Sequence, residues 1–465
     1  GAQCLDRLVR DIVTECRTFD YSAFIPVLTT RMRALNNCVR QLVLGWIVLL
    51  DSLPQVDMIA YLPQYLEGLF GILASNDRDI RHSTQVCLDE LLSEIKALKA
   101  ERPKRAQLAI ADAAPTVARC CRAGERRAED NGVRLKALDW LLEFVKLQLP
   151  AGGTTVEAEL EGTTLDDASH QCLPLPEPHP TTSALRYSSS IYLTHSRAVS
   201  AGDAARPGVD ASLDSVAAGC SEGGGTNAGG LRQLVPVLLA GALHCLDDSE
   251  GEIRQNAEQA NAALSDAARY LGSDLPFQTI ADVVLEAMWS NTDGQERSPA
   301  VLLNCLNWLQ LLLTQCRSQV LEPAVRARLF DATLRVLSRP EDEVAKKALR
   351  LIASLVTLND HSPVPEAEGD QFARMCQRLF RLMAEDLAVL SNRGELVVRQ
   401  LCDGVKAERL FATAARSVAG EKDLPYARRL VRVLNKVLLT AHETRGLRRR
   451  LRADATTSPR PGSSG

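Results

Sequence analysis

The clearest structural pattern in this chain lies in residues 36–50, NNCVRQLVLGWIVLL. Apolar residues recur there at the spacing of one face of an α-helix; they are Val39, Leu42, Val43, Trp46, Ile47 and Leu50. Asn36 and Asn37 precede them, and asparagine is favoured before a helix because its side chain accepts hydrogen bonds from the first turn. The apolar segment FIPVL at 24–28 predicts a preceding helix. These residues therefore predict two helices joined by a short turn.

The same unit recurs along the chain. An apolar residue opens each second helix, and in four of six cases a basic residue follows it directly; the six are Val39, Ile80, Val133, Ile253, Val301 and Val344, and the basic residues are Arg40, Arg81, Arg134 and Arg254. The spacings are 41, 53, 120, 48 and 43 residues. A period of about 40–47 residues with two helices per unit is typical of HEAT and armadillo arrays. We therefore predict an all-α solenoid.

One long segment interrupts the predicted array. Of the 80 residues 151–230, 34 are Gly, Pro, Ser or Thr, and ten acidic residues occur with three basic ones. Such a composition cannot bury enough apolar area to offset the entropy of ordering. We predict a disordered insertion at 150–230, and without its 80 residues the spacing of 120 becomes an ordinary 40. The predicted repeats are then 1–149 and 231–360, followed by C-terminal helices at 366–452 and a disordered tail at 453–465.

Composition and charge exclude several classes of protein. Aromatic residues are only 4% of the chain, which suits helices packed through Leu, Val and Ala better than a β-sandwich. The net charge of -4 gives no reason to expect nucleic acid as a partner. The longest apolar runs, 42–50 and 234–243, are far shorter than the roughly 20 residues that cross a bilayer. Any association with a membrane is therefore expected to be peripheral.

The residue types that carry chemistry do not gather into a recognisable site. The 13 cysteines include no C-x-x-C pair and are mostly tens of residues apart, which favours reduced, buried thiols over a disulfide framework or a zinc site. Phosphate-loop, nucleophile-elbow and H-E-x-x-H motifs are absent from the sequence. We expect no catalytic residue, no cofactor and no metal. The tryptophans Trp46, Trp140 and Trp308 are predicted to lie in the core between stacked units.

The charge feature of note is a basic C-terminus. Residues 421–452 contain ten basic and three acidic residues. One face of the last predicted helix carries the apolar residues Leu430, Val433, Leu434, Val437 and Leu438, and Arg429, Arg432 and Lys436 share the opposite face. Two readings stay open: a solvated helix face, or a contact with anionic lipid headgroups or an acidic partner. For the second reading the candidate contact residues are Arg429, Arg432, Lys436, Arg448 and Arg449.

Several segments resemble the Vac14 family of vacuole-morphology scaffolds. They span almost the whole chain apart from the insertion and follow the family's order; they are residues 24–28, 36–41, 46–52, 61–73, 398–402 and 434–440. The resemblance implies a non-enzymatic HEAT-repeat scaffold that self-associates. It also implies two partners, a phosphatidylinositol-3-phosphate 5-kinase of the PIKfyve or Fab type and a Sac-domain phosphoinositide phosphatase. The implied location is cytoplasmic, on endosomal or vacuolar membranes, where these enzymes set the level of phosphatidylinositol 3,5-bisphosphate.

The resemblance has limits that bear on function. The family has further repeats upstream, tied to kinase binding, and a long helical region downstream, tied to phosphatase binding and self-association. This chain is expected to begin after the first and to stop near the start of the second, and its insertion replaces a short connection. The alternative to the family reading is another HEAT-repeat adaptor, such as a transport receptor or a protein-phosphatase scaffold.

Overall fold

The computed structural model describes residues 2–15, 19–122, 130–149, 226–289, 297–358 and 366–457. The described elements are all helices: α1 Ala2–Glu15, α2 Tyr21–Met32, α3 Asn37–Asp51, α4 Met58–Leu73, α5 Arg78–Glu101, α6 Pro103–Arg122, α7 Asn131–Gln148, α8 Thr226–Cys245, α9 Gly251–Leu271, η2 Gly272–Asp274, α10 Phe277–Trp289, α11 Pro299–Gln315, α12 Arg317–Val320, α13 Pro323–Val336, α14 Asp342–Thr357, α15 Glu366–Glu385, α16 Leu387–Gly404, α17 Ala407–Ala419, α18 Leu424–Thr440 and α19 Arg445–Thr457.

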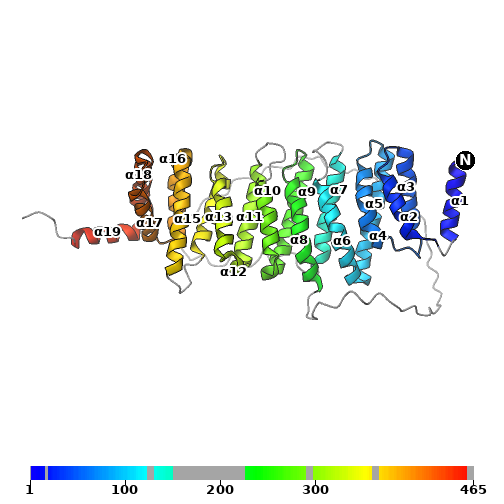
Figure 1. Ribbon diagram of the computed structural model, residues 1–465, viewed down its shortest axis with the longest axis horizontal. Coiled ribbons are helices and arrows are strands. Elements are labelled where there is room, and N and C mark those ends of the chain that lie inside the picture. Colours follow the sequence, from blue (N-terminus) through cyan, green and yellow to red (C-terminus); the bar gives the residue numbers. More distant parts are fainter. Residues whose placement is uncertain are drawn as a thin grey trace, which may run out of the picture. The chain divides into compact units, whose positions relative to one another are not determined.

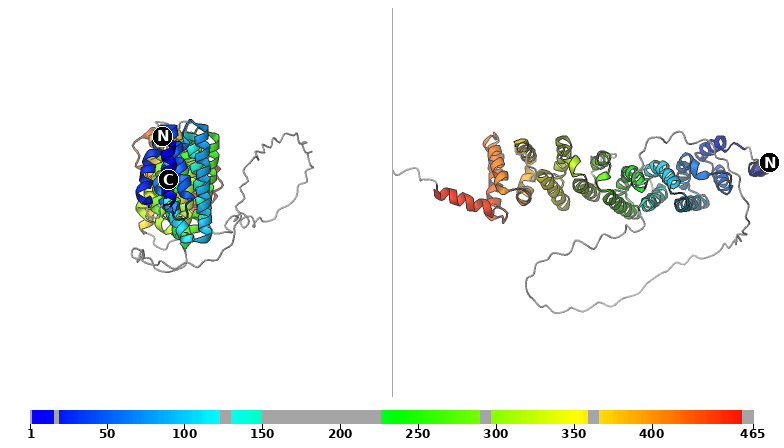
Figure 2. Two further views of the ribbon diagram at one scale, coloured as in Figure 1. Left: turned by 90° about the vertical axis from the view of Figure 1, so that its right-hand side faces the viewer. Right: turned by 90° about the horizontal axis from the view of Figure 1, so that it is seen from below.

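The helices stack as two rows in chain order (Figure 1). One row consists of the second helix of each pair, with α3, α5, α7, α9, α11, α14, α16 and α18 packing in succession. The other row consists of first helices, with α2, α4, α6, α8 and α10 in contact, then α13, α15 and α17. The right-hand view of Figure 2 shows the helix pairs nearly end-on. This repetition of helix pairs confirms the predicted all-α solenoid.

The pattern at residues 36–50 forms α3 nearly as predicted. Asn36 Oδ1 accepts hydrogen bonds from the backbone N–H groups of Cys38 (2.8 Å) and Val39 (3.4 Å), so it caps the helix. Four residues of the predicted face, Val43, Trp46, Ile47 and Leu50, are buried and Val39 is half-buried. Leu42 is 44% exposed, whereas Leu44 is 3% exposed. The buried arc is therefore turned towards Leu44, because α3 packs against α5 as well as its own partners α2 and α4.

The recurring arginines have a structural role that their spacing did not reveal. Three of them reach back to the carbonyl oxygen six residues earlier: Arg40 Nε to Ala34 O (2.8 Å), Arg81 Nη1 to Ser75 O (2.7 Å) and Arg254 Nη1 to Asp248 O (2.7 Å). Each bond satisfies a carbonyl in the turn between the two helices of a pair, which the helices themselves leave unpaired. The basic position thus fixes the turn within each of these three units.

The helices on either side of the predicted insertion pack directly together. Gly241 of α8 lies so close to α6 that a Cβ atom there would be 3.3 Å from the backbone of Ala118. The Sγ atom of Cys245 donates to the carbonyl oxygen of Cys121 at 3.2 Å. Residues 151–225 fall outside the described residues, so the prediction of disorder there stays a prediction. The array continues across this segment without a missing unit.

Two predicted boundaries are wrong by a few residues. Helix α8 begins at Thr226, five residues before the predicted boundary at 231. Gly229 and Gly230 resemble a linker in sequence, but Gly230 faces Gln148 of α7, where a Cβ would lie 3.2 Å from Oε1, so a small residue fits there. Helix α19 runs to Thr457, beyond the predicted tail start at 453. The C-terminal helices begin with α15 at Glu366.

The core consists of the apolar faces between the two rows. Trp46, Trp140 and Trp308 are all buried, as predicted. Trp140 packs edge-to-face on Phe70 and Phe144, and the indole N–H of Trp308 donates to Asn261 Oδ1 at 2.8 Å. Eight of the nine cysteines whose side chains are described are also buried, and all nine are free thiols. The burial of eight of these thiols agrees with the prediction.

Candidate binding surface of the C-terminal helices

The predicted basic residues lie on the last two helices. Helix α18 begins after Asp423, whose side chain accepts from the N–H of Tyr426 at 3.2 Å. Its inner face buries Tyr426, Ala427, Leu430, Leu434 and Val437. Arg429 and Arg432 lie on exposed positions of the same helix, and Arg449 is exposed on α19. Among the described residues these three arginines have no acidic partner.

The other two predicted residues are engaged within the protein. Lys436 forms an ion pair with Glu395 of α16, which neutralises part of its charge. Arg448 is half-buried and donates to the carbonyl oxygens of Leu438 (2.7 Å) and Ala441 (2.8 Å). It therefore closes the C-terminal end of α18, where helix carbonyls lack partners. These bonds give Arg448 a structural role, and its contact with a membrane or partner stays a prediction.

An exposed apolar stripe on α18 was missed by the sequence reasoning. Leu424 is 71%, Val431 37% and Leu439 72% exposed. Their spacing of seven and eight residues places them along one side of the helix. Because the buried residues of the inner face account for the strong amphipathic pattern of α18, that pattern does not predict this second stripe. Together with Arg429 and Arg432 it forms what we call the α18 surface.

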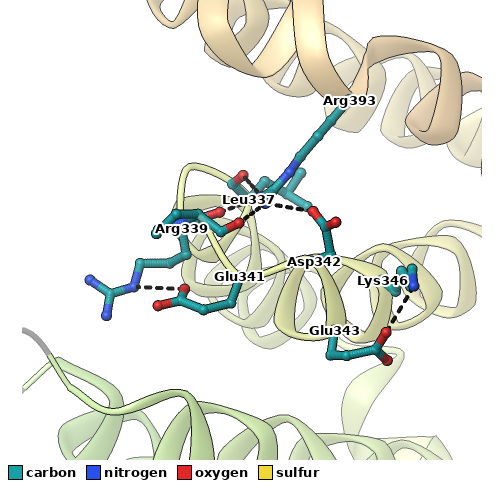
Figure 3. Close-up of polar contacts among 8 residues, drawn as sticks. Leu337, Arg339, Glu341, Asp342, Glu343, Lys346 and Arg393 are labelled. Carbon is teal, nitrogen blue, oxygen red and sulfur yellow. Dashed lines mark hydrogen bonds and ion pairs between the residues drawn. The ribbon is translucent and has the colours of Figure 1, made fainter.

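Arg393 anchors these helices to the rest of the array (Figure 3). From α16 it donates to the carbonyl oxygens of Leu337 (2.8 Å), Arg339 and Pro340 (2.7 Å), and it contacts Asp342 Oδ1 at 3.3 Å. The acceptors belong to the turn between α13 and α14. The side chain is only 11% exposed, so its charge depends on these partners.

Arg393 is the last of three arginines that each contact the unit before their own; we call this series the arginine ladder. Arg339 donates through Nη2 to the carbonyl oxygen of Arg297 at 2.6 Å, and Arg297 pairs with Asp247 at 3.6 Å. Each arginine thus contacts the turn region of the preceding unit. The ladder joins the turns of three successive units, and α16 is its last member.

The titratable groups elsewhere in the chain favour structural roles. Burial raises the pKa of the thiols of Cys87, Cys120, Cys305, Cys376 and Cys402 to about 12, so they are protonated and unreactive near neutral pH. Burial and the nearby charge of Asp51 raise the pKa of Glu94 to about 7. These two carboxyls lie where α3 packs on α5, so the shift follows from an interface between units.

Within the described ranges no group of three or more His, Cys, Asp or Glu side chains could hold a metal ion. None of the described helices is both long and apolar enough to cross a bilayer.

The stacked helix pairs define a helical-repeat protein of the HEAT type. A family model for the C-terminal part of vacuolar protein 14, described as binding the protein Fig-four, matches residues 387–460, which contain α16 to α19. A "Protein VAC14 homolog" of Arabidopsis thaliana is 28% identical over 453 residues, covering 97% of this chain and 46% of the relative. A homologue of the same name in Schizosaccharomyces pombe is 24% identical, covering 98% and 56%. The "Vacuole morphology and inheritance protein 14" of Saccharomyces cerevisiae is 23% identical, covering 93% and 50%.

These matches confirm the resemblance drawn from the sequence. The chain is similar to Vac14 proteins over at least 93% of its residues, and it spans about half the length of the curated relatives it matches. Among solved structures, a chain of a Kap95:Nup1 complex is 12% identical with a TM-score of 0.29, covering 96% of this chain and 51% of that one. Importin beta is 12% identical with a TM-score of 0.26, covering 95% and 52%.

Proposed function

We propose that this chain is a non-enzymatic scaffold for the enzymes that make and degrade phosphatidylinositol 3,5-bisphosphate. The observation that carries the proposal is the match of α16–α19 to a family model for the binding of Fig-four, in the region that exposes the α18 surface. The proposed partner of this region is the Sac-domain phosphatase. Exposed apolar side chains beside unpaired arginines suit a protein interface, whose core is apolar and whose rim is charged.

The other proposed partners rest on the family alone. They are the phosphatidylinositol-3-phosphate 5-kinase and further copies of the same protein, held on the cytoplasmic side of endosomal or vacuolar membranes. A row of stacked helices suits this role because each unit offers a strip of surface to a large partner without needing a pocket.

Affinity capture tests the phosphatase partner directly. Changing Leu424 and Leu439 to Asp should reduce the amount of Sac-domain phosphatase captured by the tagged chain at least tenfold, since charged residues would replace the exposed apolar stripe. The matched control is Leu108→Asp on α6, at a leucine that is 63% exposed and far from α18 in sequence. Quantitative mass spectrometry of the captured proteins is the measurement. Undiminished capture, or recovery of transport or protein-phosphatase partners in its place, would contradict the proposal.

Sedimentation with vesicles tests the proposed membrane contact. Reversing Arg429, Arg432 and Lys436 to Glu should weaken binding to acidic liposomes roughly thirtyfold, because Arg429 and Arg432 each contribute about 1 kcal/mol near an anionic surface. The loss should shrink as salt is raised. A control triple, Arg78→Glu, Lys104→Glu and Arg350→Glu, makes the same charge change at exposed positions elsewhere. If the α18 triple variant and the control triple variant bind liposomes equally, Arg429 and Arg432 form a solvated helix face and do not contact the membrane.

A further inference from the structure

Four arginines surround a cavity in the N-terminal units, far along the array from α18. The cavity has a volume of about 490 Å³ and is lined by α2, the start of α3, α4, the end of α6 and the start of α7. Four arginines line it, Arg33, Arg40, Arg119 and Arg122, together with the carboxylates of Glu67 and Asp130. The lining therefore carries an excess of two positive charges.

Two of the four arginines make polar contacts within the protein. Arg119 pairs with Glu67 at 2.7 Å, and Arg40 donates through Nε to the carbonyl oxygen of Ala34. Arg33 and Arg122 are exposed at the rim, and neither has an acidic partner among the described residues. Two guanidinium groups without acidic partners at one cavity offer planar hydrogen-bond donors to an anion.

The backbone around the cavity also favours an anion. Helix α7 begins at the cavity, and the side chain of Asp130 makes no capping hydrogen bond to it. The N–H groups of a first helical turn carry partial positive charge. On the opposite wall a Cβ atom built on Gly71 of α4 would meet no atom within 4 Å, so the space above this backbone is open.

We propose that this cavity binds an anion carrying at least two phosphate groups. The volume is far larger than one phosphate needs, and two phosphates supply the charge that the unpaired arginines lack. A soluble phosphorylated molecule and a lipid headgroup share this chemistry. The inference goes beyond the proposed scaffold function and does not depend on it, because none of its residues lies in α16–α19.

Calorimetric titration of the full chain with inorganic pyrophosphate tests the proposal. The double variant Arg33→Gln and Arg122→Gln should lose at least tenfold in affinity. Gly71→Glu should abolish binding with no loss of thermal stability, because its side chain enters open space. Glu67→Gln should increase affinity several-fold, because it removes a negative charge and frees Arg119; a purely structural role of these residues predicts no gain. The matched control is Arg78→Gln with Arg350→Gln, which should bind as the unmodified chain does.

A second arm separates the two sources of the anion. Vesicles of phosphatidylcholine containing cardiolipin, whose headgroup carries two phosphate groups, are sedimented with the same variants. Binding that needs Arg33 and Arg122 and is displaced by pyrophosphate identifies a lipid headgroup; pyrophosphate binding without vesicle recruitment identifies a soluble ligand. Absence of pyrophosphate binding, or binding that all variants retain, would overturn the proposal.

Discussion

Replacing Asp248 with Ala should lower the free energy of unfolding by about 3–5 kcal/mol, because it leaves a buried guanidinium without its counter-ion. Arg134 Nε and Asp248 Oδ2 are 2.8 Å apart, and their side chains are only 1% and 2% exposed. Arg134 precedes the insertion on α7, whereas Asp248 follows it in the turn before α9. The pair therefore joins the two halves of the array. Urea denaturation followed by circular dichroism is the measurement.

Two further variants give this prediction its controls. Asp266→Ala removes a carboxylate that pairs with Arg269 in solvent, where an ion pair contributes at most about 1 kcal/mol. The double change Arg134→Met with Asp248→Leu should recover most of the lost stability, because apolar residues of similar size need no counter-ion. A loss below about 1 kcal/mol in Asp248→Ala, or no recovery in the double variant, would show that the buried charge is not what destabilises the single variant.

Replacing Arg393 with Ala should destabilise the docking of α16–α19 by about 3 kcal/mol. The variant removes a charged donor from three backbone carbonyls of the α13–α14 turn, and hydrogen bonds to charged groups contribute about 1.5–3 kcal/mol each without adding fully. Amides in α16–α19 should then exchange with solvent about a hundredfold faster, while those in α2–α7 keep their rates. Hydrogen exchange read by mass spectrometry measures both regions in one experiment.

The control for this prediction lies on the same helix. Arg399 is an exposed residue of α16, so Arg399→Ala removes equal charge and equal side-chain length without touching the turn. It should leave exchange in α16–α19 unchanged. Uniform acceleration over the whole array in Arg393→Ala, or none at all, would contradict a local anchor.

The helices could be predicted from sequence because their cause is local. The spacing of Val43, Trp46 and Leu50 and the cap at Asn36 act within one helix, so they can be read without knowing any neighbour. The exposure of Leu42 could not be predicted, because it depends on the angle at which α5 packs on α3. Likewise the start of α8 depends on Gln148, which lies beside Gly230 only after folding.

For the candidate site, the sequence predicted which arginines are exposed, because exposure follows from the helix period, but it did not predict contacts between helices. Arg429, Arg432 and Arg449 are exposed, as a helix period predicts. The hydrogen bonds of Arg448 to Leu438 and Ala441 depend on the bend between α18 and α19, which has no signature in residue spacing. The pairing of Arg134 with Asp248 joins residues 114 positions apart, so the sequence showed only a recurring basic position. Three of its members fix their own turns, and Arg134 instead reaches the next unit.

The direct packing of α8 on α6 determines the distance between the arginine-lined cavity and the α18 surface. Because α7 and α8 adjoin in the array, the residues between them add nothing to the separation of the arginine-lined cavity and the α18 surface. That separation is counted in helix pairs, not in residues. A partner that contacts both surfaces would find them the same distance apart whatever the length of the segment between Gln148 and Thr226. Residues can therefore be inserted or deleted in this segment without changing the distance between the two surfaces.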